Sequence, residues 1–277
     1  MERYRRDGLT FPVRDAGPPD GEPVVLLHGF PGGAQTWDRV VPRLAASGCR
    51  VLAPEQRGYA PSARPPGRAA YGIGELVRDV LVLADTAGVE RFHLAGHDWG
   101  GMVAWALAAQ HPERLQTLTV LSTPHPKAML RSLVSSPQLI RSWYIGLFWL
   151  PDVAERLLLA RDGTVLRAML GRSGLDAAVA EQYVRRMQEP GALSGALAWY
   201  RALRPGWAAS IGPVPVPTSY LWSSADAAID ERAAILSARY VAEPYRLRTV
   251  EASHWLPECE PELVATTILE RVTPPDR

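Results

Sequence analysis

Gly96-His97-Asp98-Trp99-Gly100-Gly101 is the stretch of this chain that decides its fold. It follows the run 91–95, which has the character of a strand, and it opens the small-residue stretch 100–109, which has the character of a helix. A sharp turn from strand to helix holds its central residue in a strained conformation, so the flanking positions must be small. Glycine on both sides meets that demand. The stretch therefore has the pattern of a nucleophile elbow with Asp98 at its tip.

Outward from this turn, strand-like runs alternate with helix-like stretches. The expected strands cover residues 23–27, 50–53, 91–95, 115–121, 217–223 and 245–250. The expected helices in the same regions cover residues 36–46, 73–87 and 100–109. This alternation predicts an α/β fold with a mostly parallel central sheet flanked by helices.

The alternation stops in the middle of the chain. Residues 126–211 contain only helical stretches, punctuated by prolines, and the segments at both ends of this block are rich in turn residues. We therefore expect a core α/β domain whose first part is 1–125, a helical cap at 126–211 inserted late in the chain, and a second part of the core at 212–277.

Length and composition narrow the classes of protein. The 277 residues suffice for one large domain with an insertion, and 47% of them are hydrophobic. A net charge of +1 gives no reason to expect nucleic acid or a membrane as a partner. Cys49 and Cys259 match no metal-ligand spacing and are expected to be reduced thiols. The polar N-terminus does not resemble a signal peptide, so we expect a cytoplasmic protein. The expected oligomeric state is a monomer or a homodimer.

Asp98 changes the chemistry that such a turn performs. The central residue is usually serine, which attacks an acyl carbon. A carboxylate is a poor acyl nucleophile, but it can displace a leaving group from an sp³ carbon, and the product is an alkyl ester that water must cleave. The helix dipole favours the ionised form of Asp98. The simpler alternative, that Asp98 only caps the helix, is disfavoured by its glycine-rich setting after a strand.

Together with His28-Gly29-Phe30-Pro31, the stretch resembles the α/β-hydrolase family of soluble epoxide hydrolases and haloalkane dehalogenases. The resemblance extends over nearly the whole chain. It implies a core sheet, a helical cap, and a catalytic triad of an aspartate, a histidine and a further acid. Glu55, Ala60 and Ser223 depart from residues that are common in the family, but these positions belong to turns.

The water that cleaves the ester needs a general base. In this fold the triad follows the chain order nucleophile, acid, histidine, and His254 is the only histidine after the cap. Asp226, after the expected strand 217–223, is at the family's position for the acid that orients the imidazole. Asp230 is the runner-up for that role. The backbone N–H groups of Phe30 and Trp99 are expected to bind the oxyanion that forms on the Asp98 carboxyl.

The leaving group distinguishes epoxide hydrolysis from haloalkane dehalogenation. An epoxide oxygen leaves as an alkoxide and needs an acid opposite Asp98, with a pKa near that of a phenol, whereas a halide needs no proton. Tyr144 and Tyr200 lie in segments that resemble those carrying the ring-opening tyrosine pair of epoxide hydrolases. The alternative is that both tyrosines are structural aromatic residues of the hydrophobic core. Many dehalogenases carry asparagine where this chain has Phe30.

We therefore predict an epoxide hydrolase that converts an apolar epoxide to a vicinal diol with no metal or organic cofactor. The alternatives are a haloalkane dehalogenase and a non-catalytic small-molecule receptor, and the intact triad argues against the receptor. Aromatic side chains are expected to form an apolar substrate pocket. They are Phe30, Trp99, Trp143, Phe148 and Trp199.

Overall fold

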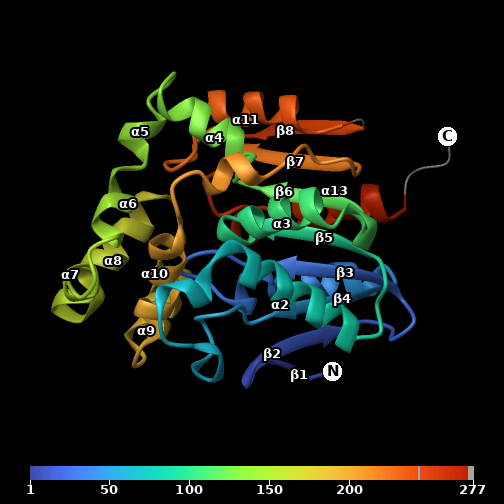
Figure 1. Ribbon diagram of the computed structural model, residues 1–277, viewed down its shortest axis with the longest axis horizontal. Coiled ribbons are helices and arrows are strands. Elements are labelled where there is room, and N and C mark those ends of the chain that lie inside the picture. Colours follow the sequence, from blue (N-terminus) through green and yellow to red (C-terminus); the bar gives the residue numbers. More distant parts are fainter. Residues whose placement is uncertain (243, 274–277) are drawn as a thin grey trace.

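An eight-stranded sheet forms the centre of the computed structural model, which describes residues 1–242 and 244–273 (Figure 1). β1 and β2 are antiparallel to their neighbours, and β4, β3, β5, β6, β7 and β8 run parallel to one another. This confirms the mostly parallel sheet. In spatial order the strands are β1 (Arg3–Arg6), β2 (Leu9–Ala16), β4 (Cys49–Pro54), β3 (Glu22–Leu27), β5 (Phe92–His97), β6 (Leu115–Leu121), β7 (Thr218–Ser223) and β8 (Tyr245–Val250).

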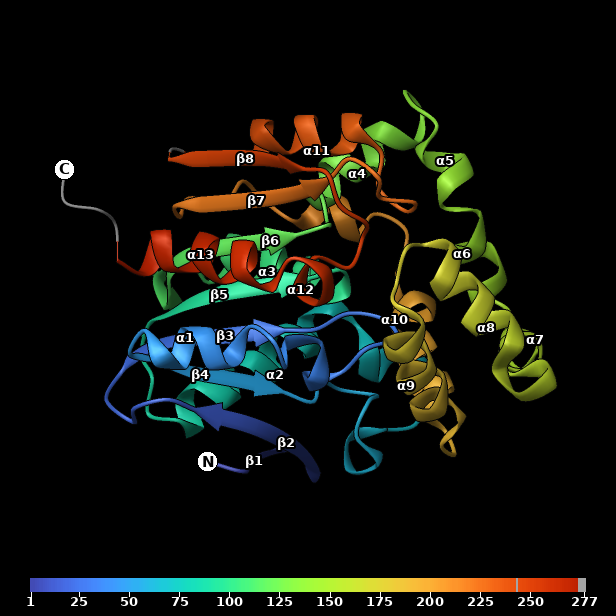
Figure 2. The ribbon, with the colours of Figure 1, turned by 180° about the vertical axis from the view of Figure 1, so that it is seen from behind.

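Helices cover both faces of the sheet. α2 (Ile73–Thr86) and α3 (Trp99–Gln110) lie on one face, and α1 (Val41–Ala46) and α13 (Pro261–Val272) lie on the other (Figures 1 and 2). The central strand β3 is buried on both sides over residues 24–27, which explains why this stretch is a continuous apolar run. The remaining helical segments of the core are α11 (Glu231–Ser237), α12 (Leu256–Cys259) and the 3₁₀ turns η1 (Ala34–Trp37), η2 (Pro61–Ala63), η3 (Arg68–Tyr71), η4 (Pro112–Arg114) and η6 (Ala238–Tyr240).

The segment between β6 and β7 is helical and contains no strand, and all of it is described. Figure 2 shows α6 to α10 beside the ends at which β3, β4 and β7 finish, so this block stands next to the turn that carries Asp98. Its elements are α4 (Pro126–Leu133), α5 (Gln138–Arg141), α6 (Trp143–Phe148), α7 (Val153–Leu158), α8 (Ala160–Arg172), α9 (Ala177–Gln188), α10 (Ala192–Ala202) and η5 (Trp207–Ser210).

The structure differs from the sequence-based expectation at two places in the first part of the core. The single helix expected at 36–46 is two pieces, η1 and α1, because Pro42 lies in the first turn of α1 and starts a helix rather than continuing one. The strands β1 and β2 were not expected. They are held by inward-facing aromatics, since Tyr4 pairs with Phe11 and their rings stack at 4.6 Å.

None of the helices in the described ranges combines the length and the apolar character that crossing a bilayer requires.

Candidate active site

The turn after β5 holds Asp98 in a strained backbone conformation. Its φ is 50° and its ψ is −122°, a region that residues other than glycine rarely occupy. Close packing explains the glycines around it. A Cβ on Gly96 would lie 2.4 Å from the carbonyl oxygen of Gly100, and a Cβ on Gly29 would lie 2.4 Å from Oδ1 of Asp98. The hydroxyl of Thr123, after β6, donates to the Asp98 carbonyl oxygen at 2.8 Å.

The carboxylate of Asp98 is held between a backbone donor and an imidazole. The N–H of Phe30 donates to Oδ1 at 2.8 Å, and Nε2 of His254 lies 3.6 Å from Oδ2. Burial alone would raise the pKa of Asp98, but His254 and the Phe30 N–H stabilise the anion and lower it. Asp98 is therefore ionised at neutral pH. In the described part of the chain, the Trp99 N–H makes no hydrogen bond to this carboxylate, so its role as a second donor stays a prediction.

Asp226 contacts the other side of the imidazole. Nδ1–H of His254 donates to its Oδ2 at 2.8 Å, while its Oδ1 accepts from the N–H groups of Ala228 at 2.7 Å and Ile229 at 3.0 Å. Asp230 instead caps α11 by accepting from the Arg232 N–H at 3.1 Å. The structure therefore brings Asp226, rather than Asp230, to His254.

His254 carries a strongly shifted pKa. Burial disfavours the imidazolium, but the charges and hydrogen bonds of Asp226 and Asp98 outweigh it and raise the pKa to about 10. The imidazole is thus charged at neutral pH.

Two buried side chains that sequence reasoning did not assign fix the backbone of His254. The Ser122 hydroxyl donates to the His254 carbonyl oxygen at 2.8 Å, and Nε2–H of His97 donates to the same oxygen at 2.9 Å. Burial, assisted by the charge of His254, lowers the pKa of His97 to about 4, so His97 is neutral and keeps one N–H donor. Ser122 directly follows β6, at the same sheet edge as Asp98. Its position after a predicted strand could have indicated a place at the site.

Tyr144 and Tyr200 reach the site from α6 and α10. Burial, and then the negative charge of Asp98, raises the pKa of both phenols, so each stays protonated and can donate a hydrogen bond. Phe148 joins them, with its ring centroid 5.3 Å from that of Tyr144 and 4.9 Å from that of Tyr200. On the core side, the Tyr200 ring also contacts Trp99 at 4.8 Å and Phe30 at 5.7 Å.

The five aromatic residues expected around the substrate do not all lie together. Phe30, Trp99 and Phe148 belong to the buried cluster around Tyr200. Trp199 is buried behind Trp99, with the centroids 5.7 Å apart, and its indole N–H donates to the Arg57 carbonyl oxygen at 2.7 Å. The structure does not bring Trp143 to the cluster, because neighbouring helix positions point about 100° apart and its side chain is 69% exposed.

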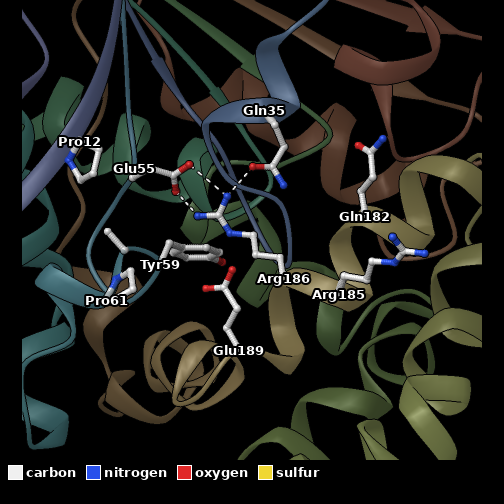
Figure 3. A pocket seen from close by; sticks show the side chains of 10 residues that line it. Pro12, Gln35, Glu55, Tyr59, Pro61, Gln182, Arg185, Arg186 and Glu189 are labelled. Atoms are coloured by element: carbon white, nitrogen blue, oxygen red, sulfur yellow. Dashed lines mark hydrogen bonds and ion pairs between the residues drawn. The ribbon is translucent and has the colours of Figure 1, made fainter.

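A separate surface pocket of about 550 Å³ lies between α9 and the core loops. Arg186 binds Glu55 and Gln35 at this pocket, and it also lies over the Tyr59 ring (Figure 3). Asp98, His254 and Asp226 do not line it. The candidate active site therefore lies at the Asp98 turn, and this pocket lies where α9 meets the loops that follow β3 and β4.

Comparisons with known proteins agree with this geometry. The alpha/beta hydrolase fold family matches residues 22–261. AB hydrolase superfamily protein YfhM of Bacillus subtilis is 37% identical, over 95% of this chain and 94% of that protein. Epoxide hydrolase A of Mycobacterium tuberculosis is 31% identical, over 96% and 95%. The crystal structure of epoxide hydrolase A from Mycobacterium thermoresistibile superposes with a TM-score of 0.84 at 26% identity, covering 97% of this chain and 96% of that one. With most of its length matched in this way, the chain belongs to the alpha/beta hydrolase fold family.

Proposed function

We propose that this protein hydrolyses an apolar epoxide to a vicinal diol through a covalent ester on Asp98. The observation that carries the proposal is the environment of the Asp98 carboxylate. The carboxylate accepts a hydrogen bond from the Phe30 N–H at 2.8 Å and lies 3.6 Å from Nε2 of His254, the proposed base. Its negative charge also raises the pKa of the phenols of Tyr144 and Tyr200 on the cap. The similarity to proteins named epoxide hydrolases supports the same substrate class.

In the first step the epoxide ring opens. Tyr144 and Tyr200 donate hydrogen bonds to the epoxide oxygen while Asp98 attacks one ring carbon. A bond forms between a carboxylate oxygen and that carbon, and the carbon–oxygen bond of the ring breaks. Its electron pair goes to the leaving oxygen, which takes a proton from one tyrosine. The phenolate recovers its proton from solvent.

In the second step water cleaves the ester. His254 takes a proton from water, and the oxygen of that water attacks the acyl carbon of Asp98. The Phe30 N–H stabilises the resulting oxyanion. The bond from the acyl carbon to the alkoxide then breaks, and the alkoxide takes the proton that His254 removed from water, which completes the diol. Ester formation prepares this step, because it removes one of the two negative charges that raise the pKa of His254. The imidazolium then loses its proton to solvent more easily, before the water attacks, and the neutral imidazole can act as the base.

A halide assay separates this activity from dehalogenation. A panel of apolar epoxides and haloalkanes is assayed for diol and for free halide, and we expect diol from the epoxides.

Asp98→Ala should abolish turnover. Tyr144→Phe with Tyr200→Phe should slow ring opening by at least about 100-fold, since an acid of this kind typically contributes 10²–10⁴. Tyr71→Phe, whose hydroxyl donates to Pro65 away from the site, is the matched control. Halide release that exceeds diol formation would contradict the proposal.

A further inference from the structure

Three buried polar side chains from separate segments form a chain of hydrogen bonds that the proposed chemistry does not use. The hydroxyl of Tyr183, on cap helix α9, lies 3.0 Å from Oγ1 of Thr36. The same hydroxyl donates to Oε1 of Glu258 at 2.5 Å. All three side chains are buried. One hydroxyl of the cap therefore joins two segments of the core.

The two ends of this chain belong to the two loops that perform ester hydrolysis. Thr36 follows Phe30 in the loop that supplies the oxyanion donor, and Glu258 lies on α12, directly after the loop that carries His254. A shift of either end would therefore change the distance between the base and the ester carbonyl.

The cap also contacts both neighbours of His254 in the sequence. The indole N–H of Trp255 donates to the Ser173 hydroxyl at 2.9 Å. A Cβ on Gly174 would lie 2.6 Å from Cβ of Ser253, so the cap backbone packs directly on this residue. The Trp255 ring lies between the cap and the base, with its centroid 5.3 Å from that of His254 and 6.1 Å from that of Tyr183. The position of the His254 loop thus depends on the cap.

Burial of the Glu258 carboxyl group costs free energy, and an apolar side chain at this position would avoid that cost. Burial raises the pKa of Glu258 to about 7, opposed by the hydrogen bond from Tyr183. Its Oε2 is buried and finds no partner among the described residues. Hydrogen bonds fix a geometry more narrowly than apolar contacts do, so the bond from Tyr183 to Oε1 of Glu258 specifies one arrangement of cap and loops. Gly32 leaves room for it, since a Cβ there would lie 2.3 Å from Oγ1 of Thr36.

We propose that Tyr183 and Glu258 are positioning residues that hold the His254 loop against the cap for ester hydrolysis. This inference rests on the two-step reaction proposed above. It assigns the pair to the second step only, because Tyr144, Tyr200 and Asp98 open the ring without the base. Loss of the pair should therefore let the ester form and slow its decay.

Rapid mixing of enzyme with excess epoxide tests this assignment, with the ester followed by mass spectrometry of the intact protein. In Tyr183→Phe and Glu258→Leu we expect ester decay to slow by about 10- to 100-fold, the effect of a misplacement of about 1 Å, and the ester to accumulate. Ester formation should stay within about twofold of wild type by the same reasoning. Glu258→Gln, which keeps an acceptor for Tyr183, should recover most of the decay rate.

Glu262→Gln is the matched control, since this carboxylate is exposed and pairs with Arg43 on the surface. Thr36→Val tests the other end of the chain of hydrogen bonds if Tyr183→Phe does not fold. Unchanged decay in all variants, or an equal loss in both steps, would overturn the positioning role. Failure of the proposed function looks different, because wild type would then form no ester at all.

Discussion

The pKa of His254 is the property of a single residue that links the structure to the pH dependence of the reaction. Burial opposes its charged form, but Asp226 and Asp98 raise the pKa from 6.5 to about 10. Because the folded value exceeds the unfolded one, the stabilisation from charged His254 is fully present below pH 6.5 and is lost as the pH rises through about 10. The resting enzyme therefore holds an imidazolium beside two carboxylates.

Esterification of Asp98 should lower this pKa, because an ester carries no charge. We predict that the rate of ester decay increases with pH and levels off at a lower pH than the one at which His254 titrates in the resting enzyme. The first value comes from rapid-mixing kinetics across a pH series, and the second from NMR titration of the imidazole. Coincident inflections would show that the Asp98 charge does not control the base.

At the scale of elements, the contact between α3 and β3 sets the position of Asp98. Gly100 lies in the first turn of α3, and a Cβ there would meet the Leu27 carbonyl oxygen at 2.1 Å. We predict that Gly100→Ala pushes α3 from the sheet, lowers the free energy of unfolding by about 1–3 kcal/mol and reduces activity. Chemical denaturation and diol formation measure the two effects.

Gly171→Ala is the control for helix propensity. Gly171 lies in α8, and nothing surrounds the place where its Cβ would be. This substitution should leave activity unchanged and raise the free energy of unfolding by up to about 1 kcal/mol. Equal effects of the two substitutions would show that close packing at residue 100 is not what matters.

Some of the elements could be predicted from the sequence, and others could not. All six predicted strands are present. Central strands such as β3 are buried apolar runs, whereas the edge strand β8 shows partly buried residues alternating with exposed ones over most of its length. β1 and β2 are not predicted, because β1 is a short edge strand of four residues and β2 buries only Phe11 and Val13 and contains a proline. The strained turn at Asp98 could be predicted, because only small residues such as glycine fit around it. The exposure of Trp143 was not, because residue spacing alone does not say which way a short helix faces the core.

At the scale of the whole molecule, an ion pair joins α9, from the helical segment between β6 and β7, to the loop after β4. Arg186 of α9 binds both carboxylate oxygens of Glu55 in the pocket of Figure 3. Burial opposes the charge of Glu55, but His28 and Arg186 lower its pKa below 4.5. A lowered pKa means that this stabilisation is present above pH 4.5 and is lost as the pH falls through the folded value.

We predict that Arg186→Met lowers the free energy of unfolding at pH 7 by about 3 kcal/mol, because it leaves a largely buried carboxylate without its partner. The loss should shrink below pH 4.5, where the unpaired Glu55 gains a proton. Denaturation at several pH values measures it. Arg185→Met, at a side chain that is 75% exposed on the same helix, should cost at most about 0.5 kcal/mol. A similar cost for both substitutions would contradict a specific role of the Arg186 pair.

The oxygen that enters the product tests the central proposal most directly. A single turnover is run with excess enzyme in water labelled with ¹⁸O, and the diol is analysed by mass spectrometry. If Asp98 attacks the epoxide, the added oxygen comes from its carboxylate, so the first diol carries no label and the label appears in the peptide that contains Asp98. Label in the diol of the first turnover would mean that water attacks the epoxide directly, and the covalent mechanism would be wrong.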